Sequence, residues 1–196
     1  MGGTGLSGHL GMTYNPYDPT HTRLIGGSSC GSAAVTANAV VPYALGSDTG
    51  DSIRKPASFA GLVGLKPTWS RISRYGLFPF APSMDTVGFF TRSVKDCGYL
   101  LNVTSGRDEN DSTSSTREVE DYVRLIGKPV EGLKVAVIKE INEAVKDKDI
   151  MNAFNKTIEG LKAKGVVVEE VSLDTTMLAS VFPTYFVISR AEATSN

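Results

Sequence analysis

The chain has 196 residues, long enough for one domain with a sizeable core, and 41% of its residues are hydrophobic. Its 20 Lys and Arg nearly balance 21 Asp and Glu, which argues against a basic face that binds nucleic acid by phosphate neutralisation alone. No apolar run approaches the ~18 residues that cross a bilayer, and residues 1–9 do not resemble a signal peptide. Cys30 and Cys97 are far apart without C-x-x-C spacing, so we expect free thiols in a reducing compartment.

The glycine-rich part of the chain, residues 1–105, alternates tight turns with short apolar runs. The small residues at 32–39 are compatible with a helix, 40–45 is an apolar run, and 52–60 predicts a short helix. The last elements expected in this part are buried strands at 62–65 and 86–91, then a helix at 97–103 with Ser93 as its N-cap and Asp96 completing the capping pattern.

A polar segment, residues 106–130, follows and predicts a surface loop with a short helix near 119–126. Regular patterning returns in residues 131–196. Composition therefore divides the chain into 1–105, 106–130 and 131–196. We interpret these segments as parts of one incomplete domain over 1–196.

A strand-helix-strand pattern occupies the start of the last segment. Residues 133–138 and 166–171 predict strands, and residues 147–163 predict a helix that Gly165 ends. A βαβ unit of this length pairs its two strands in parallel. The sequence therefore predicts an α/β fold with a mixed, mostly parallel sheet flanked by helices.

Two glycine turns that contain serine carry the densest chemistry, one at 26–29 and one at 50–52. Glycine turns before helices expose main-chain N–H groups, which can hold a phosphate or an oxyanion, and a serine among them can be a nucleophile. Taken alone, each turn is more often an ordinary turn with an N-cap serine. Phosphate-loop and dinucleotide motifs are absent. No nucleophile-elbow pattern supports a Ser-His-Asp triad with His9 or His21.

The combined pattern around these turns is more specific than either turn. It consists of GGSSCGSAA at 26–34, LGSDTGDSIRKPASF at 45–59 and GLVGLKPT at 61–68. These segments closely resemble the signature sequence of the amidase family, including the interval between Ser28 and Ser52. The resemblance extends over essentially the whole chain and implies the amidase signature fold.

The resemblance also implies a Ser–cis-Ser–Lys mechanism. In it, Ser52 matches the nucleophile that forms an acyl ester, and Ser28 matches the bridging serine, which follows a cis peptide bond. Asp48 and Arg54 match structural positions, and two such side chains in a glycine-dense region are expected to need partners. The implied oxyanion hole consists of the main-chain amides of Thr49, Gly50, Asp51 and Ser52, with Ser47 and Gly27 in supporting positions.

Three features depart from the family pattern. Asp51 stands where the family usually has glycine, and its carboxylate must point away from a developing oxyanion if the site is active. Cys30 also replaces a common glycine, and no histidine is evidently placed to activate it as a nucleophile. The family's catalytic lysine lies upstream of the first serine turn, yet none of the residues before Ser28 is lysine. The first lysine is Lys55, and both Lys66 and Lys95 match structural positions.

We therefore expect the chain to be a fragment of a longer protein and to be inactive on its own. Residues 1–4 resemble a loop inside the family domain, and the chain stops in a helical stretch at Asn196.

Within the family, the chain most resembles the A subunits of tRNA-dependent amidotransferases. The similar segments are 71–94, 106–115 and 183–196, the last with Glu192, Ala193 and Asn196 in frame. The resemblance implies a glutaminase that works in a heterotrimer with the B and C subunits and supplies ammonia for converting Glu-tRNA(Gln) to Gln-tRNA(Gln). It also implies that Glu-tRNA(Gln) is bound mainly by the B subunit, that the partner holds ATP and Mg²⁺, and that the glutamine-recognising side chains lie beyond Asn196.

No cofactor or metal site is expected on this chain, and no membrane association. The resemblance places such a complex in the bacterial cytoplasm or an organellar matrix. Two alternatives remain open. One is a stand-alone amidase that acts on a small carboxamide, and the other is a non-catalytic scaffold remnant, which Asp51 and the absent lysine favour.

Overall fold

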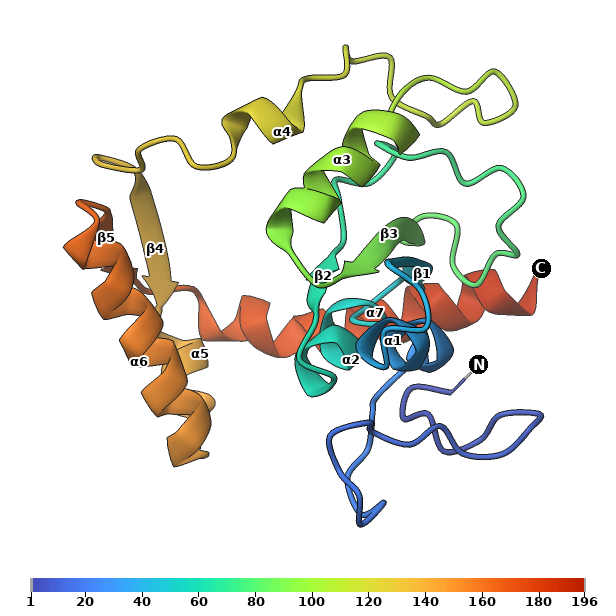
Figure 1. Ribbon diagram of the computed structural model, residues 1–196, viewed down its shortest axis with the longest axis horizontal. Coiled ribbons are helices and arrows are strands. Elements are labelled where there is room, and N and C mark those ends of the chain that lie inside the picture. Colours follow the sequence, from blue (N-terminus) through green and yellow to red (C-terminus); the bar gives the residue numbers. More distant parts are fainter. Residues whose placement is uncertain (1, 196) are drawn as a thin grey trace. The chain divides into compact units, whose positions relative to one another are not determined.

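The computed structural model describes residues 2–195, which form two compact units. The first unit comprises residues 2–126 and 188–195 of the described chain, and the second comprises Gly127–Val187. Figure 1 labels the helices and strands of both units.

The first unit is built on a three-stranded sheet with the strand order β1-β3-β2, formed by β1 (Ala44–Asp48), β2 (Val63–Leu65) and β3 (Thr86–Thr91). Strand β3 pairs antiparallel with both neighbours, with Asp48 opposite Thr86 in one pair and Leu65 opposite Phe89 in the other.

The prediction of a mostly parallel sheet was wrong for this unit. Strands β1 and β2 run in the same direction and are joined through a helix, but β3 lies between them, so neither has a parallel neighbour in the described residues. The α/β class itself is confirmed.

Short helices pack against this sheet. Helix α1 (Cys30–Ala37) contacts β1 and β3, and helix α2 (Arg54–Phe59) contacts β2. Helix α3 (Val94–Thr104) contacts β3 and the short helix α4 (Tyr122–Leu125). The core beside the two serine turns consists of Ile25, Ala33, Ile53, Ala57, Ala60 and Phe90.

Local sequence explains the position of several elements. The Ser93 hydroxyl accepts a hydrogen bond from the Asp96 N–H at 3.1 Å and donates one to the Asp96 carboxylate at 2.8 Å, so the predicted cap of α3 is confirmed. Helix α2 lies close to the sheet because Gly64 has no side chain: a Cβ at this position would overlap the Cβ of Ala57.

The polar loop after α3 is held by its own side chains. The Asp111 carboxylate accepts the N–H of Arg74 at 2.8 Å and that of Thr113 at 2.9 Å. The Asp108 carboxylate accepts the Ser73 hydroxyl at 2.6 Å. These contacts tie the loop to residues 73–74, and the short helix expected after it is present as α4.

The second unit contains the predicted βαβ pattern. Strands β4 (Lys134–Ile138) and β5 (Val167–Val171) pair in parallel, and helix α6 (Lys148–Ala163) connects them. Asp147 caps α6 by accepting the N–H groups of Asp149 and Ile150, and Gly165 ends it with φ of 79°. Helix α5 (Lys139–Ala144) was not predicted, and α7 (Thr175–Thr194) begins in this unit.

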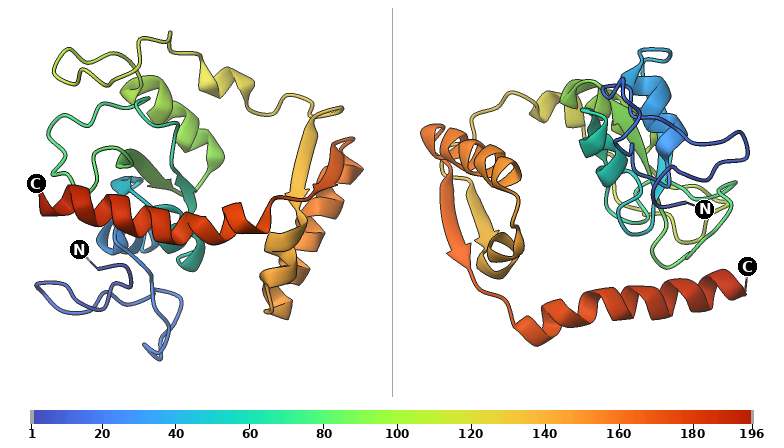
Figure 2. Two further views of the ribbon diagram at one scale, coloured as in Figure 1. Left: turned by 180° about the vertical axis from the view of Figure 1, so that it is seen from behind. Right: turned by 90° about the horizontal axis from the view of Figure 1, so that it is seen from below.

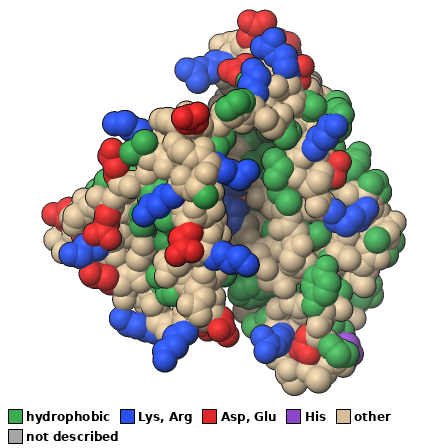
Figure 3. All heavy atoms as spheres, turned by 60° about the vertical axis from the view of Figure 1, so that its left-hand side comes forward, with side chains coloured by type: hydrophobic (Ala, Val, Ile, Leu, Met, Phe, Trp, Pro, Cys, Tyr) green, Lys and Arg blue, Asp and Glu red, His purple; other side chains and the backbone are tan. Residues whose placement is uncertain are grey.

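Charged side chains of both signs are interspersed over the face drawn in Figure 3, in agreement with the near-zero net charge. Among residues 2–195, no helix is long and apolar enough to cross a membrane. Figure 2 shows the same elements from two further directions.

Candidate active site

The two serine turns predicted to form one site lie next to each other. The main-chain N–H of Ser29 donates to the carbonyl of Ser52 at 3.3 Å, which joins the turn before α1 to the turn before α2. The peptide bond between Gly27 and Ser28 is cis, as the family pattern implied. Ser28 is exposed and Ser52 is half-buried, so solvent reaches this part of the first unit.

Neither serine turn supplies an ordinary N-cap serine to the helix that follows it. Ser29 occupies the N-cap position of α1, but its hydroxyl makes no capping bond there. It instead donates to the carbonyl of Ser47 at 3.2 Å and accepts the Ser47 N–H at 3.3 Å. Helix α2 has Ile53 at its N-cap position and therefore has no side-chain cap from that residue. The serines thus connect the turns to strand β1 and to each other.

Gly27 is required by close packing. A Cβ at this position would overlap the carbonyl oxygen of Gly2 and lie 3.2 Å from the carbonyl carbon of Gly3. The loop at residues 2–5 therefore packs directly on the main chain that carries Ser28. Gly46 in β1 is similar, since a Cβ there would lie 2.8 Å from the Ser29 hydroxyl oxygen.

In the turn at Thr49–Ser52, main-chain N–H groups are unpaired within the described residues, whereas main-chain carbonyl groups accept hydrogen bonds. None of the hydrogen bonds formed within residues 2–195 uses the N–H of Gly50, Asp51 or Ser52 as its donor. The carbonyl oxygen of Gly50 accepts the Arg54 guanidinium, and that of Ser52 accepts the Ser29 N–H. Such a row of unpaired N–H groups can stabilise an anion.

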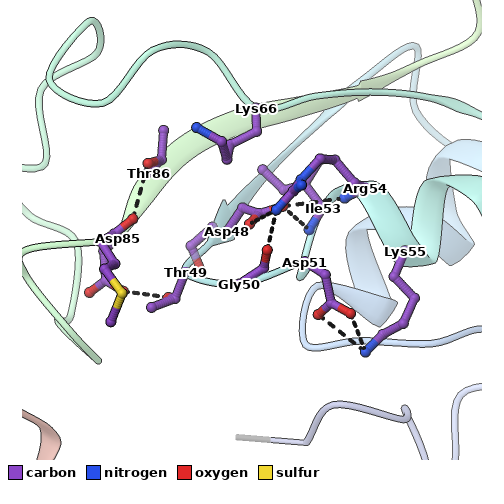
Figure 4. Close-up of polar contacts among 12 residues, drawn as sticks. Asp48, Thr49, Gly50, Asp51, Ile53, Arg54, Lys55, Lys66, Asp85 and Thr86 are labelled. Atoms are coloured by element: carbon purple, nitrogen blue, oxygen red, sulfur yellow. Dashed lines mark hydrogen bonds and ion pairs between the residues drawn. The ribbon is translucent and has the colours of Figure 1, made fainter. Parts of the chain in front are cut away.

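Asp48 fixes the end of this turn that leads into helix α2. Its carboxylate, 1% exposed as a residue, accepts the N–H of Ile53 at 3.0 Å and that of Arg54 at 3.4 Å. The Arg54 guanidinium also binds it, with Nε at 3.2 Å and Nη2 at 3.1 Å (Figure 4). The expected pairing of these two residues is present. The hydrogen bond that Arg54 donates to Asp48 is the main cause of the raised pKa of Arg54, so this guanidinium stays charged.

The Asp51 carboxylate is neutralised by a cation. Lys55 Nζ lies 2.9 Å from one of its oxygens and 3.2 Å from the other, and Figure 4 shows the side chain directed toward Lys55 and away from Gly50. The sequence did not assign this role to Lys55, although residues four apart at a helix start are neighbours. The concern that Asp51 repels an oxyanion is therefore much reduced.

Two further lysines have engaged ammonium groups. Lys66 Nζ donates to the Pro67 carbonyl at 2.8 Å, and Lys95 Nζ lies 5.7 Å from the centre of the Tyr99 ring. The rings of His21 and Tyr14 are in tilted contact, with centres 4.1 Å apart and an interplanar angle of 47°.

The cysteines do not extend the site. Both thiols are free, as expected. Burial raises the pKa of the Cys97 thiol, which lies 3.1 Å from the Thr91 hydroxyl. Within residues 2–195, no three His, Cys, Asp or Glu side chains gather in a way that could hold a metal ion.

A buried carboxylate that local sequence patterns do not indicate contacts the turn. The Thr49 hydroxyl donates to Asp85, which is 3% exposed and lies just before β3 (Figure 4). The contact follows from the register in which β1 pairs with β3, and a single sequence does not reveal that register. Nearby, Glu192 accepts the Ser83 N–H at 3.0 Å, whereas Asn196 lies outside the described residues.

A hollow of about 1060 Å³ lies elsewhere in the first unit, between residues 67–71 and 115–125. Arg71, one of the arginines that line it, donates hydrogen bonds to the Tyr122 hydroxyl and to the carbonyls of Arg117 and Glu118. None of the predicted catalytic residues lines this hollow, which is therefore separate from the candidate site at the serine turns.

Comparison with known proteins decides the family. The sequence profile of the amidase family matches residues 1–196. The chain belongs to this family. It is 49% identical over its full length to the A subunit of glutamyl-tRNA(Gln) amidotransferase from Staphylococcus aureus strain MRSA252, and it spans 40% of that protein's length.

Solved structures agree. The crystal structure of the glutamyl-tRNA(Gln) amidotransferase A subunit from Thermotoga maritima matches with a TM-score of 0.87 and 44% identity, covering 93% of this chain and 39% of that one. The peptide amidase of Stenotrophomonas maltophilia matches with a TM-score of 0.82 and 31% identity, covering 97% of this chain and 39% of that one. The amidase family member described here thus spans about two fifths of these relatives.

Proposed function

We propose that this chain carries the nucleophile and the oxyanion donors of a glutaminase, the A subunit of a tRNA-dependent amidotransferase. The observation that supports this most is the hydrogen bond of 3.3 Å that joins the turn with the cis Gly27–Ser28 bond to the carbonyl of Ser52. The 49% identity to an amidotransferase A subunit over the full chain supports the choice of an amidotransferase subunit over a stand-alone amidase.

In the proposed reaction, the Ser52 hydroxyl oxygen attacks the side-chain amide carbon of glutamine. Its proton passes to the Ser28 hydroxyl, which hands its own proton to a base. The negative charge that develops on the amide oxygen is stabilised by the N–H groups of the Thr49–Ser52 turn. Collapse of this intermediate, with a proton delivered to the leaving nitrogen, releases ammonia and leaves a glutamyl ester on Ser52. Water then cleaves the ester to give glutamate.

In this proposal, the base that starts the relay is none of the three lysines of the first unit. Lys55, Lys66 and Lys95 are held by Asp51, a carbonyl oxygen and an aromatic ring, respectively. A lysine serves as a base only when it is neutral, which requires a depressed pKa and therefore an apolar or cationic setting. The Lys55 side chain is directed to the Asp51 carboxylate instead.

The remaining components of the reaction belong to partner proteins in this proposal. The B and C subunits complete the assembly, Glu-tRNA(Gln) is held by the B subunit, and ATP with Mg²⁺ activates its glutamyl group there. The absence of a phosphate-binding motif in the sequence and its net charge of −1 are consistent with this division. The complex works in the bacterial cytoplasm or an organellar matrix, where aminoacyl-tRNA is used.

A stand-alone amidase is the second candidate, because the peptide amidase of S. maltophilia matches 97% of the chain with a TM-score of 0.82. The scaffold alternative loses one of its two grounds, since Lys55 neutralises Asp51. The test is ammonia release from glutamine by the natural polypeptide that contains this chain, alone and with candidate B and C subunits. Release only with the partners supports the amidotransferase, and release without them supports the stand-alone amidase.

A further inference from the structure

Asp85 is a buried carboxylate that the proposed reaction does not use. It is 3% exposed, and its two oxygens accept three hydrogen bonds from neutral donors. One oxygen binds the Thr49 hydroxyl, and the other accepts the N–H groups of Phe80 at 2.7 Å and Ala81 at 3.0 Å. Burying a charged carboxylate is costly unless it is well hydrogen-bonded. The three hydrogen bonds of Asp85 offset this cost and hold its side chain in place.

The strand register explains why Asp85 reaches Thr49. Strands β1 and β3 pair antiparallel, and their last pair joins Asp48 to Thr86. One residue further along, Thr49 follows Asp48 and Asp85 precedes Thr86, so the two side chains meet where the strands end. Figure 4 shows this contact beside the turn that leads to Asp51.

The turn is thus held at both ends by carboxylates and is open between them. Asp48 binds the N–H of Ile53 at its far end, and Asp85 binds Thr49 at its near end. The N–H groups of Gly50, Asp51 and Ser52 lie between these two anchors without partners in the described residues. Free donors aimed at an oxyanion need such anchoring because they make no bonds of their own.

We propose that Asp85 is a positioning residue, which fixes the oxyanion donors of the Thr49–Ser52 turn through the Thr49 hydroxyl. This inference rests on the proposed amidohydrolase function. Asp85 does not touch the reacting atoms in this account. It restricts the turn to one geometry, and the loss of that restriction lowers the rate of the chemical step more than it weakens substrate binding.

The chain offers a matched control for a buried aspartate. Asp18 is 8% exposed and binds the Thr20 hydroxyl and the N–H groups of Thr22 at 2.8 Å and Arg23 at 2.6 Å. It therefore resembles Asp85 in burial and in donor types, but its partners lie in its own loop. Asp18→Asn reports the general effect of losing such a carboxylate.

The test measures kcat and KM for glutamine in the natural polypeptide that carries this chain, assembled with its partners. Asp85→Asn and Thr49→Val are each expected to lower kcat about tenfold or more with little change in KM, since small misplacements of catalytic groups have effects of this order. The double variant is expected to be no slower than the slower single variant. Thr49→Ser should recover most of the rate lost in Thr49→Val, and Asp18→Asn should leave kcat unchanged.

A second measurement does not depend on turnover. Backbone ¹⁵N order parameters of Gly50, Asp51 and Ser52 are expected to fall from about 0.85 to below about 0.7 in Asp85→Asn and Thr49→Val, but not in Asp18→Asn. Unchanged order parameters would overturn the inference. It would also be overturned if the losses of kcat in Asp85→Asn and Thr49→Val multiplied in the double variant. If the wild-type protein releases no ammonia, the proposed function fails, and the order parameters still decide the role of Asp85.

Discussion

Lys55 Nζ lies 2.9 Å from the Asp51 carboxylate, at the start of the helix that follows the proposed nucleophile. The pair places a charge and its counter-charge beside the proposed oxyanion donors. Because Asp51 adjoins Ser52, its unpaired carboxylate would raise the energy of an oxyanion, whereas the paired one has little net effect at a distance.

Lys55→Ala is therefore expected to lower kcat only about three- to tenfold at low salt, because solvent screens the exposed Asp51 side chain. Steady-state ammonia release checks this. The double variant Asp51→Gly with Lys55→Ala should regain the lost rate, and added salt should shrink the defect. A defect of equal size in the double variant would show that Lys55 acts in another way.

Asp48 is expected to contribute more to stability than its partner Arg54. The carboxylate is buried and accepts two main-chain N–H groups as well as the guanidinium, whose side chain is 52% exposed. Asp48→Ala leaves these donors unpaired and should lower the free energy of unfolding by roughly 3 kcal/mol. Arg54→Ala should cost less, since Asp48 keeps its main-chain partners. Urea unfolding of both variants gives the comparison, and a larger loss for Arg54→Ala would contradict it.

Gly27→Ala is expected to disrupt the site through backbone packing. The added Cβ would overlap the Gly2 carbonyl, and neither main-chain segment can move without shifting the other. The matched control is Gly31→Ala in helix α1, where a Cβ meets no atom within 4 Å. Because alanine favours helices, the control should gain about 0.5–1 kcal/mol, whereas Gly27→Ala should lose stability and Ser52 reactivity. Thermal unfolding and acylation of Ser52 measure the two effects.

Asp111 should make the first unit sensitive to acid. The N–H of Arg74, followed by the Thr113 hydroxyl, lowers the pKa of Asp111 from its ordinary value of 3.8. A depressed folded-state pKa contributes stability above the unfolded value, and this contribution is lost as pH falls through the folded value. Asp111→Asn should therefore be less stable than wild type near neutral pH and flatter below pH about 4. Glu109→Gln, whose side chain is 89% exposed, should keep the wild-type profile.

Much of the fold follows from local signals. The strand at Thr86–Thr91 has the predicted bounds, and Ser93 with Asp96 predicts the start of α3 because capping depends on residues three apart. The βαβ unit is likewise present, with Gly165 ending its helix. Helix α5 was missed because it follows strand β4 directly, without a turn residue between them.

The errors concern contacts between distant segments. The insertion of β3 between β1 and β2 depends on pairing across about forty residues, which local patterns do not encode. The contact of Asp85 with Thr49 depends on that same pairing and was missed for the same reason. The Asp51–Lys55 pair differs, because its spacing of four residues was readable from the sequence.

The most direct test of the central claim is to trap the acyl ester on Ser52. The natural polypeptide containing this chain, assembled with candidate B and C subunits, is incubated with glutamine, quenched in acid and digested for mass spectrometry. We predict a glutamyl adduct on the peptide containing Ser52, with ammonia released and both signals lost in Ser52→Ala. Ammonia release that persists in Ser52→Ala, or no adduct and no ammonia in the wild-type complex, would contradict the account.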